Sequence, residues 1–275
     1  MNTTADGQLE YFARYGRTTD ITHHAELVAG LPSDPAAAGE VVRGLLIHNW
    51  TAAMNGIETS PERDGMRTFG AAPTLHRILS LDPSPLDQRR SEEERLIGYC
   101  YHFAVLHCAF LRAAGVPSRT RCGFANYLDD GKWIDHWVVE YWDENQWRLN
   151  DPQIGLDELS HDDFRDGVRA WQLCRAGGAD AADHGNGELW GWDELRGSLV
   201  NDLGALNKLE IGDWDWCQPL KVDPLDQPHP QIDAQLDVFA GLADRGQPIK
   251  ELHAAFNSDS EIRPPEPIIE RAERH

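Results

Sequence analysis

The sequence predicts an α+β fold in which one helix packs on an antiparallel sheet. The helix is expected to begin near Cys100 and to end before Gly115, which stands where helices commonly finish in a left-handed conformation. Its buried stripe recurs at helical spacing and comprises Phe103, Leu106, His107, Phe110, Leu111 and Ala114. Beyond residue 118 the pattern changes to that of strands. A helix followed by antiparallel strands is typical of the α+β class.

Three strands are expected after this helix, at residues 118–127, 133–142 and 147–151. The second is rich in Trp, Val, Ile and Tyr, which favour strands. A turn centred on Glu144-Asn145 would join the last two strands and pair Trp142 with Trp147. The same register pairs Glu140 with Leu149.

The rest of the chain is expected to add helices to this core. They are expected at residues 35–54, 74–81, 91–97, 205–209 and 234–242. The first begins with Ser33-Asp34-Pro35, a cap residue followed by Pro at the first helical position. The chain from Arg263 to Pro267 is expected to be extended, because it is rich in proline.

We expect one compact domain with three parts. Residues 1–90 form a mainly helical part, residues 91–155 a catalytic core, and residues 156–275 an extension that covers the core. The extension carries several tryptophans among Gly and Asp, namely Trp171, Trp190, Trp192, Trp214 and Trp216. These side chains would cover the sheet or shape a pocket, and ordinary core packing is the alternative.

The composition argues against several classes of partner. The chain has 275 residues and a net charge of -21, and its acidic residues are dispersed. Such a surface repels nucleic acid and anionic membranes. There is no apolar run long enough for a membrane helix and no secretory pattern at the N-terminus. Five cysteines without a CxxC pair fit a reducing compartment. We therefore expect an acidic cytoplasmic protein without a cofactor.

Cys100 is the candidate nucleophile because of its place at a helix start. The thiolate is the reactive form of cysteine, and both a helix N-terminus and an imidazolium favour it. Cys108 lies in the middle of the same helix, where a cysteine behaves as a small apolar residue. The remaining cysteines are given the same structural interpretation; they are Cys122, Cys174 and Cys217.

The expected hairpin register brings His136 and Asp151 together. Side chains alternate along a strand, so His136 shares a face with Val138, which lies opposite Asp151. Diagonal neighbours on one face are about 7–8 Å apart, within reach of a histidine–carboxylate hydrogen bond. Asp135 points to the opposite face, so Asp151 is the better orienting carboxylate. A bulge of one residue would reverse this conclusion.

These three residues have the chemistry of an acyl-transfer triad. We expect Cys100 to attack a carbonyl. His136 would hold the thiolate as an ion pair and later protonate the leaving group, and Asp151 would orient the imidazole. The backbone N–H of Cys100 is a natural oxyanion donor at a helix start. Asn49 or Trp50 is the candidate for the second donor.

Four ordered motifs resemble the transglutaminase-like superfamily. They are Gly98–Ala104, Leu111–Arg119 with Gly123-Phe124, His136–Glu140 and Trp147–Pro152. The resemblance covers residues 95–153. It implies a papain-like fold with a triad of Cys100, His136 and Asp151. Relatives include protein cross-linkers, peptidases, deamidases, peptide N-glycanases and amide-forming biosynthetic enzymes, so the resemblance specifies the fold and leaves the reaction open.

Acyl transfer to an amine, by amide-bond formation or transamidation, is the favoured reaction. The acyl donor is expected to be a small molecule or a peptide, and a carrier-bound thioester belongs to this class. A cysteine hydrolase with the same triad is one alternative, and a non-catalytic binding protein on the same fold is another. A zinc site of Cys100, Cys122 and His136 is a further alternative, but no paired CxxC or HxxxH spacing supports it.

Substrate contacts are expected from residues close to the triad in the sequence. Tyr99 and His102 flank the nucleophile, and Trp137 follows His136. Arg119 is expected to point outward from the first strand, where its partner would be a substrate carboxylate or an exposed carboxylate of the protein.

Overall fold

The central element is a mixed sheet in which β6, β5, β4, β3 and β7 are neighbours in that order. The computed structural model describes residues 5–212, 229–244 and 249–273. The strands are β3 (Ser118–Ala125), β4 (Trp133–Asp143), β5 (Gln146–Asp151), β6 (Leu156–Leu159), β7 (Phe164–Asp166), β8 (His184–Asn186) and β9 (Leu189–Trp190). Neighbours are antiparallel, except that β8 runs parallel to β4. The three predicted strands are therefore confirmed, within two residues at each end.

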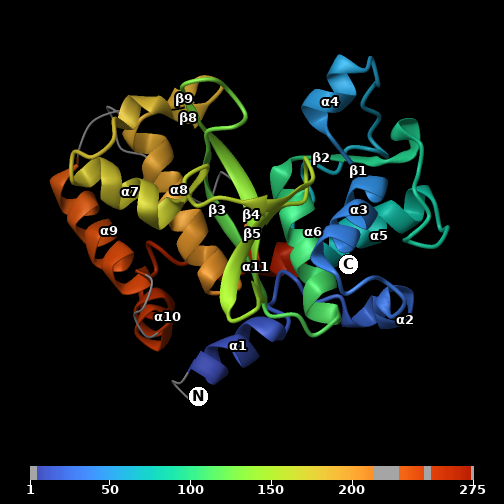
Figure 1. Ribbon diagram of the computed structural model, residues 1–275, viewed down its shortest axis with the longest axis horizontal. Helices are drawn as coiled ribbons and strands as arrows, with labels where there is room; N and C mark the ends of the chain where they lie inside the picture. The colour runs from blue at the N-terminus through green and yellow to red at the C-terminus, as the bar shows by residue number, and fades with distance from the viewer. Residues whose placement is uncertain (1–4, 213–228, 245–248, 274–275) are drawn as a thin grey trace.

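Two groups of helices flank this sheet (Figure 1). The N-terminal group contains α2 (Ala25–Val28), α3 (Pro35–Leu45), α4 (Asn49–Met54), α5 (Ala71–Leu81) and α6 (Cys100–Ala113). The C-terminal group contains α7 (Gly167–Arg175), α8 (Trp192–Leu206), α9 (Pro230–Ala243) and α10 (Ile249–Ser258). Short 3₁₀ turns are η1 (Thr22–His24), η2 (Glu92–Glu94) and η3 (Ala181–Asp183). The predicted α+β class is confirmed.

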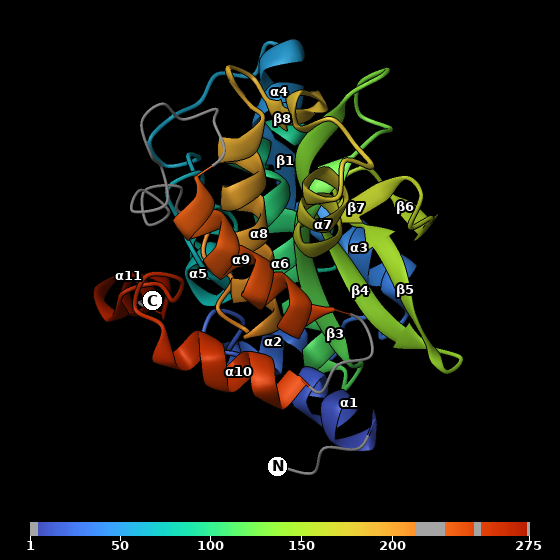
Figure 2. The ribbon, with the colours of Figure 1, turned by 90° about the vertical axis from the view of Figure 1, so that its left-hand side faces the viewer.

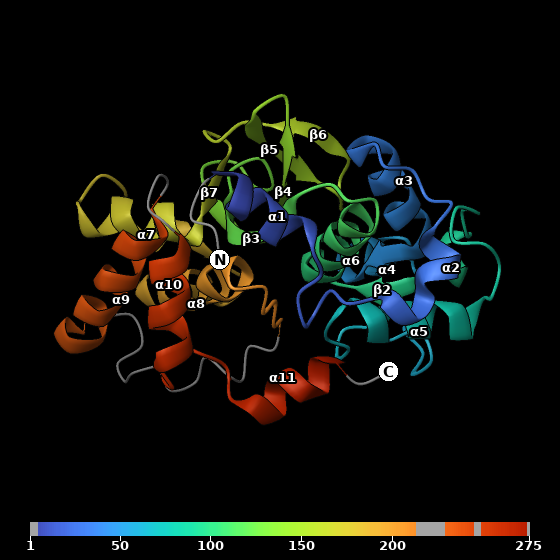
Figure 3. The same cartoon turned by 90° about the horizontal axis from the view of Figure 1, so that it is seen from below.

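The first and last helices of the chain pack away from the group of helices to which each is adjacent in sequence. The first helix, α1 (Ala5–Ala13), lies below the sheet in Figure 1 and contacts β3. The last helix, α11 (Glu266–Glu273), leaves the C-terminal group and contacts α5 (Figure 3). The extended end predicted from Arg263 is thus wrong from Glu266 onward, where the chain forms a helix that buries Ile269 and Ala272.

The helices α6 and α8 both pack against β3, and α8 lies beside α9 in Figure 2. Around α6 the core contains Phe103, Phe110 and Trp137, all nearly fully buried. Around α8 it contains Phe124 and Trp171. The predicted stripe on α6 is confirmed except for Ala114, which is exposed because α6 ends one residue earlier.

The helix predicted at 35–54 is wrong in one important respect. It breaks at Leu46 into a short strand, β1 (Leu46–His48), which pairs in parallel with β2 (Leu96–Gly98). The separate helix α4 follows at once. The short helix predicted at 91–97 is correspondingly a 3₁₀ turn, η2, followed by β2. A strand that forms only through a distant partner leaves no local signal in the sequence, so helical spacing dominates the prediction.

The β4–β5 hairpin has the predicted register. Trp142 pairs with Trp147 and Glu140 with Leu149. Glu144 and Asn145 both have positive φ, 45° and 66°, as a type I′ turn requires. This turn fixes which side chains of β4 and β5 share a face, and so determines the position of Asp151 relative to His136.

Arg119 is buried, contrary to its predicted outward position on the strand, and so is Arg121 on the same strand. Nε of Arg119 donates to Glu140 over 2.6 Å, and its guanidinium lies 4.2 Å from the centre of the Trp147 ring. Arg121 donates to Glu140 and, with two nitrogens, to Asp202 of α8. A buried charge of this kind has to be paired, and these pairs join the C-terminal helices to the sheet.

The extension beyond residue 156 contains more regular structure than predicted. Of the helix expected at 205–209, only the first two residues are helical, as the end of α8, which begins at Trp192 and ends at Leu206. The helix expected at 234–242 is confirmed as α9. Trp171 is fully buried, and its ring packs edge-on against Trp192 at 5.8 Å. Trp214, Trp216 and Cys217 lie outside the described residues.

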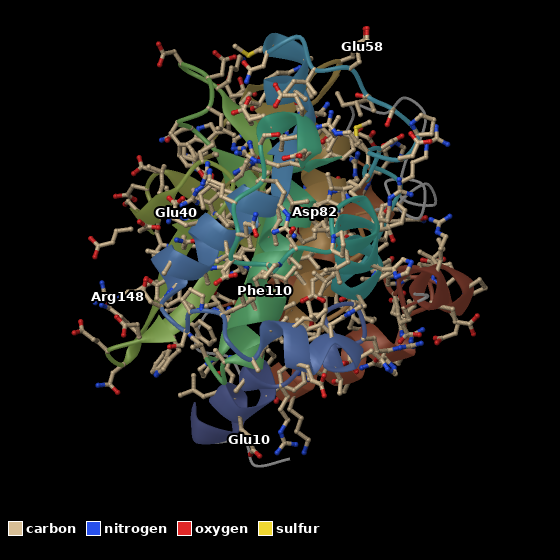
Figure 4. The ribbon with its side chains drawn as sticks, turned by 90° about the vertical axis from the view of Figure 1, so that its right-hand side faces the viewer. Glu10, Glu40, Glu58, Asp82, Phe110 and Arg148 are labelled. Carbon is tan, nitrogen blue, oxygen red and sulfur yellow. The ribbon has the colours of Figure 1, made fainter. Side chains whose placement is uncertain are left out.

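Acidic side chains are spread over the surface rather than gathered in one place. Figure 4 labels Glu10, Glu40, Glu58 and Asp82, which come from different segments of the chain. Within the described ranges, no helix combines the length and the apolar character that crossing a bilayer requires.

Candidate active site

The helix α6 begins at Cys100 and is capped by its own third residue. The Tyr99 backbone N–H donates to Nδ1 of His102 over 3.0 Å, and Nε2 of His102 donates to the Thr68 carbonyl over 2.9 Å. Burial lowers the pKa of His102 to about 4, so the ring is neutral at physiological pH. His102 is 1 % exposed and therefore supports the turn before Cys100. The predicted contact of His102 with a substrate is therefore wrong, because both ring nitrogens are engaged by the backbone of the protein.

Cys100 differs from the other described cysteines in its exposure. It is half-buried, whereas Cys108, Cys122 and Cys174 are buried. Burial raises the pKa of the Cys108 and Cys122 thiols, and it raises that of Cys174 to about 11. These three thiols are protonated and shielded, which suits the packing role expected of them.

His136 and Asp151 form a buried hydrogen-bonded pair. Nε2 of His136 donates to Oδ2 of Asp151 over 2.7 Å, and both side chains are almost inaccessible to solvent. The hairpin register therefore joins these two residues as the alternation of side chains predicts. Because Asp151 engages Nε2, Nδ1 is the ring nitrogen left for the Cys100 sulfur, which is one of the groups that raise the pKa of this histidine.

The electrostatics of this group favour a protonated histidine. Burial alone would lower the pKa of His136, but Asp151 and Cys100 raise it to about 10. Burial would raise the pKa of Asp151, but His136 and several hydrogen-bond donors hold it below its ordinary value. The arrangement therefore stabilises an imidazolium beside the sulfur, and an imidazolium stabilises a thiolate.

Tyr127 is a fourth member of the group that was not predicted. Its hydroxyl donates to Oδ2 of Asp151 over 2.9 Å, and its ring lies perpendicular to that of His136 at 6.2 Å. The backbone N–H of Gln153 donates to the other oxygen, Oδ1, over 2.9 Å. The carboxylate is thus held from both sides. Tyr127 follows β3, and Gly123 of β3 pairs with His136, so the alternation from 123 to 127 was the available signal.

Asp135 does not take part in this group. Its carboxyl lies on the opposite face of β4, 3.9 Å from the Cys122 sulfur. Burial raises the pKa of Asp135 to about 7, although His136 acts in the other direction. The choice of Asp151 over Asp135 as the partner of His136 therefore agrees with the geometry.

His48 lies near the triad and was also not predicted. It pairs with Gly98 in the β1–β2 ladder, two residues before Cys100. Burial, and then the charge of His136, lower the pKa of His48 to about 4. Its Nδ1 accepts the Trp50 N–H over 3.3 Å, so the neutral ring carries its proton on Nε2.

The two predicted oxyanion donors are differently placed. The Trp50 backbone N–H already donates to His48, and the Trp50 side chain is 58 % exposed. Asn49 is half-buried, and within the described part of the chain its Oδ1 has no hydrogen-bond partner. The backbone N–H of Cys100 lies in the first turn of α6, where helix N–H groups lack partners within the helix.

Of the remaining predicted substrate contacts, only Tyr99 is at the surface. Its side chain is 37 % exposed and adjoins Cys100. Trp137 is buried beneath Tyr101, with ring centres 5.3 Å apart. Arg119 is engaged by Glu140. The structure therefore gives neither Trp137 nor Arg119 a surface at which a substrate could touch it.

The described residues hold no group of three or more His, Cys, Asp and Glu side chains that could bind a metal ion. Cys122, one ligand of the zinc alternative, instead lies 3.7 Å from the Ser198 hydroxyl. A cavity of about 400 Å³ opens next to α11, lined by residues that include Arg17, Asp20 and Glu273. No member of the triad lines that cavity.

Residues 81–152 match the family model of the transglutaminase-like superfamily core. This segment contains α6 and the strands β3, β4 and β5, and with them Cys100, His136 and Asp151. The chain therefore carries a transglutaminase-like core, as the motifs predict.

One solved structure is described as a "putative cysteine protease" from Cytophaga hutchinsonii. It is similar to this chain at 18 % sequence identity and a TM-score of 0.37, over 56 % of this chain and 47 % of that one. The chain thus spans about half the length of that protein. No curated protein matches the chain.

Proposed function

We propose that the protein catalyses cysteine-dependent acyl transfer through a thioester acyl-enzyme. The observation that supports this most is the buried His136–Asp151 pair beside a half-exposed cysteine at a helix start. It combines an activated sulfur, an imidazolium and a carboxylate that orients it, which is the set of groups that covalent acyl transfer requires.

The proposed reaction has two halves. The Cys100 thiolate attacks the carbonyl carbon of the acyl donor, and N–H groups in the first turn of α6 stabilise the oxyanion. The tetrahedral intermediate collapses as His136 protonates the leaving group. A primary amine then attacks the thioester and gives its proton to His136, and the released product is an amide.

Hydrolysis is the second candidate, because Cys100 is half-exposed and water can therefore approach the thioester. The predicted tryptophan cover does not decide against it, since Trp171 and Trp192 pack on each other among the C-terminal helices. Incubation with acyl thioesters, with and without a primary amine, separates the two. Amide product supports transfer, and free acid alone supports hydrolysis.

The central test is intact-mass detection of an acyl adduct after exposure to thioesters. We expect one adduct on the wild type and on Cys108→Ala, and none on Cys100→Ala. Iodoacetamide should label Cys100 faster than it labels a free thiol. Ordinary thiol reactivity together with no adduct would favour a non-catalytic binding protein instead.

A further inference from the structure

Three aromatic rings lie in contact beside the nucleophile. The β1–β2 pairing places His48 opposite Gly98, and the next residue along the chain is Tyr99. The His48 ring centre lies 5.9 Å from that of Trp50 and 6.3 Å from that of Tyr99. The Trp50 ring is nearly perpendicular to the His48 ring, and the Tyr99 ring is steeply inclined to it. Segments far apart in the sequence thus build one aromatic surface, which we call the His48 surface, from His48, Trp50 and Tyr99.

The two outer rings of the His48 surface are exposed. Trp50 is 58 % exposed and Tyr99 37 % exposed. Among the described residues, they are the aromatic members of the exposed large apolar side chains. A single exposed aromatic ring needs no explanation. Here two exposed rings are joined through a third, and one of them, Tyr99, directly precedes the nucleophile, so together they offer an apolar contact surface.

The His48 surface is electrically neutral. His48 is held uncharged by its burial, and its Nδ1 is occupied by the Trp50 N–H. Burial raises the pKa of Tyr99, and beyond that Asp64 raises it further while Arg67 lowers it, so the two charges oppose each other at this ring. A charged acyl group would therefore gain little here, whereas an apolar or aromatic group can stack on the exposed rings.

The backbone connects the His48 surface to the nucleophile. Tyr99 directly precedes Cys100 and is electrostatically coupled to its sulfur. His48 is coupled in the same way to His136 and Asp151. A group that stacks on Tyr99 is therefore held next to the residue that carries the attacking sulfur.

We propose that the His48 surface is the acyl-donor subsite and that it takes an acyl group carrying an aromatic or bulky apolar substituent next to the reacting carbonyl. This inference rests on the proposed acyl-transfer function and specifies its substrate class. Its test therefore has to separate selectivity among acyl donors from reactivity of the sulfur.

The test compares phenylacetyl and acetyl thioesters of N-acetylcysteamine, which share a leaving group. With the full chain as the enzyme, the rate of thiol release at donor concentrations well below KM gives kcat/KM for the acylation of Cys100. We expect the wild type to prefer the phenylacetyl donor by about tenfold, which is the scale of one or two aromatic contacts. Trp50→Ala and Tyr99→Ala should each lose most of that preference.

Trp142→Ala is the matched control. Trp142 is a partly exposed tryptophan at the turn end of β4 and should retain the wild-type preference. Trp50→Leu keeps a larger apolar side chain than alanine if Trp50→Ala does not fold, and it should reduce the preference by a smaller factor.

Two outcomes overturn the inference in different ways. Acylation of the wild type without a preference, or an equal preference in the wild type and both alanine variants, refutes the subsite and leaves the proposed function standing. No acylation of Cys100 by either donor counts against the proposed function and refutes the subsite with it.

Discussion

At the scale of single residues, Asp151 is the best-defined part of the site. One oxygen accepts from His136 and Tyr127, and the other from the backbone of the following turn. Each lone pair that faces a donor stabilises the charged form of the carboxylate. The carboxylate can therefore remain ionised although it is fully buried, and it can hold the imidazole in one orientation.

Replacing Tyr127 by Phe should remove one of these donors and keep the ring against His136. We expect kcat/KM to fall by about tenfold, as when other orienting partners are lost. We also expect the acidic limb of the pH profile to move to higher pH, because the pKa of Asp151 rises without the Tyr127 hydroxyl. Tyr141→Phe, a buried tyrosine of the same sheet, is the control. An unchanged acidic limb in Tyr127→Phe would contradict this role.

His136 should titrate near pH 10 rather than near its ordinary value. Because Asp151 and Cys100 raise its pKa, Asp151→Asn and Cys100→Ala should each bring the titration to lower pH. Histidine-labelled NMR measures this directly. Turnover should also decline as the pH rises through 10, when His136 no longer protonates the leaving group. A wild-type midpoint near pH 6.5 would show that the ion pair does not form.

At the scale of elements, β1, β2 and α6 form one support for the nucleophile. β2 carries the chain to Cys100, and β1 places His48 beside it. His102 secures the junction by accepting the Tyr99 N–H and donating to Thr68. The position of the sulfur thus depends in part on His102, a buried side chain that no substrate reaches.

Replacing His102 should test this support. His102→Ala removes the acceptor for the Tyr99 N–H, and loss of a helix cap costs about 1 kcal/mol in the free energy of unfolding. His102→Gln restores an acceptor at the same helix position, where Gln is a common partner in a capping box. We expect chemical denaturation to show a larger loss for Ala than for Gln. Equal losses would mean that packing volume, and not the cap, is what His102 supplies.

The elements also show what the sequence can predict. The hairpin and the helix α6 follow from local patterns, a two-residue turn with alternation in one case and a stripe ending at Gly115 in the other. These patterns were sufficient to join His136 with Asp151. The strand β1 has no such pattern, because Leu46 and Ile47 become a strand only by pairing with β2. His48 was missed for the same reason.

At the scale of the whole molecule, buried and half-buried histidines make stability depend on pH. The pKa values of four are lowered to about 4, chiefly by burial; they are His48, His102, His107 and His184. Between about pH 6.5 and 4 the unfolded chain binds protons at these sites and the folded chain does not, so stability falls as the pH falls. His136 acts in reverse, because its raised pKa stabilises the fold below about pH 6.5 and loses this effect towards pH 10.

We therefore expect stability to be greatest near neutral pH. Asp135 offsets part of the acidic effect, since its raised pKa stabilises the fold most at low pH and loses that contribution as the pH rises through 7. One carboxyl does not outweigh four histidines. Urea denaturation at about pH 4.5, 7 and 9.5 measures the curve. His107→Gln should flatten its acidic side, and equal midpoints at the two lower pH values would refute the prediction.

The Arg121 contacts have a consequence for anyone who transfers this core between relatives. The segment that matches the family model, residues 81–152, contains Arg121 and Glu140 but neither Asp166 nor Asp202. A chimera exchanged at those boundaries would keep Glu140 but would contain a buried guanidinium whose two other counter-charges have to come from the host chain. The segment that matches the family model is thus smaller than the unit that folds. A transferred core has to include β7 and α8 as well, because they carry Asp166 and Asp202.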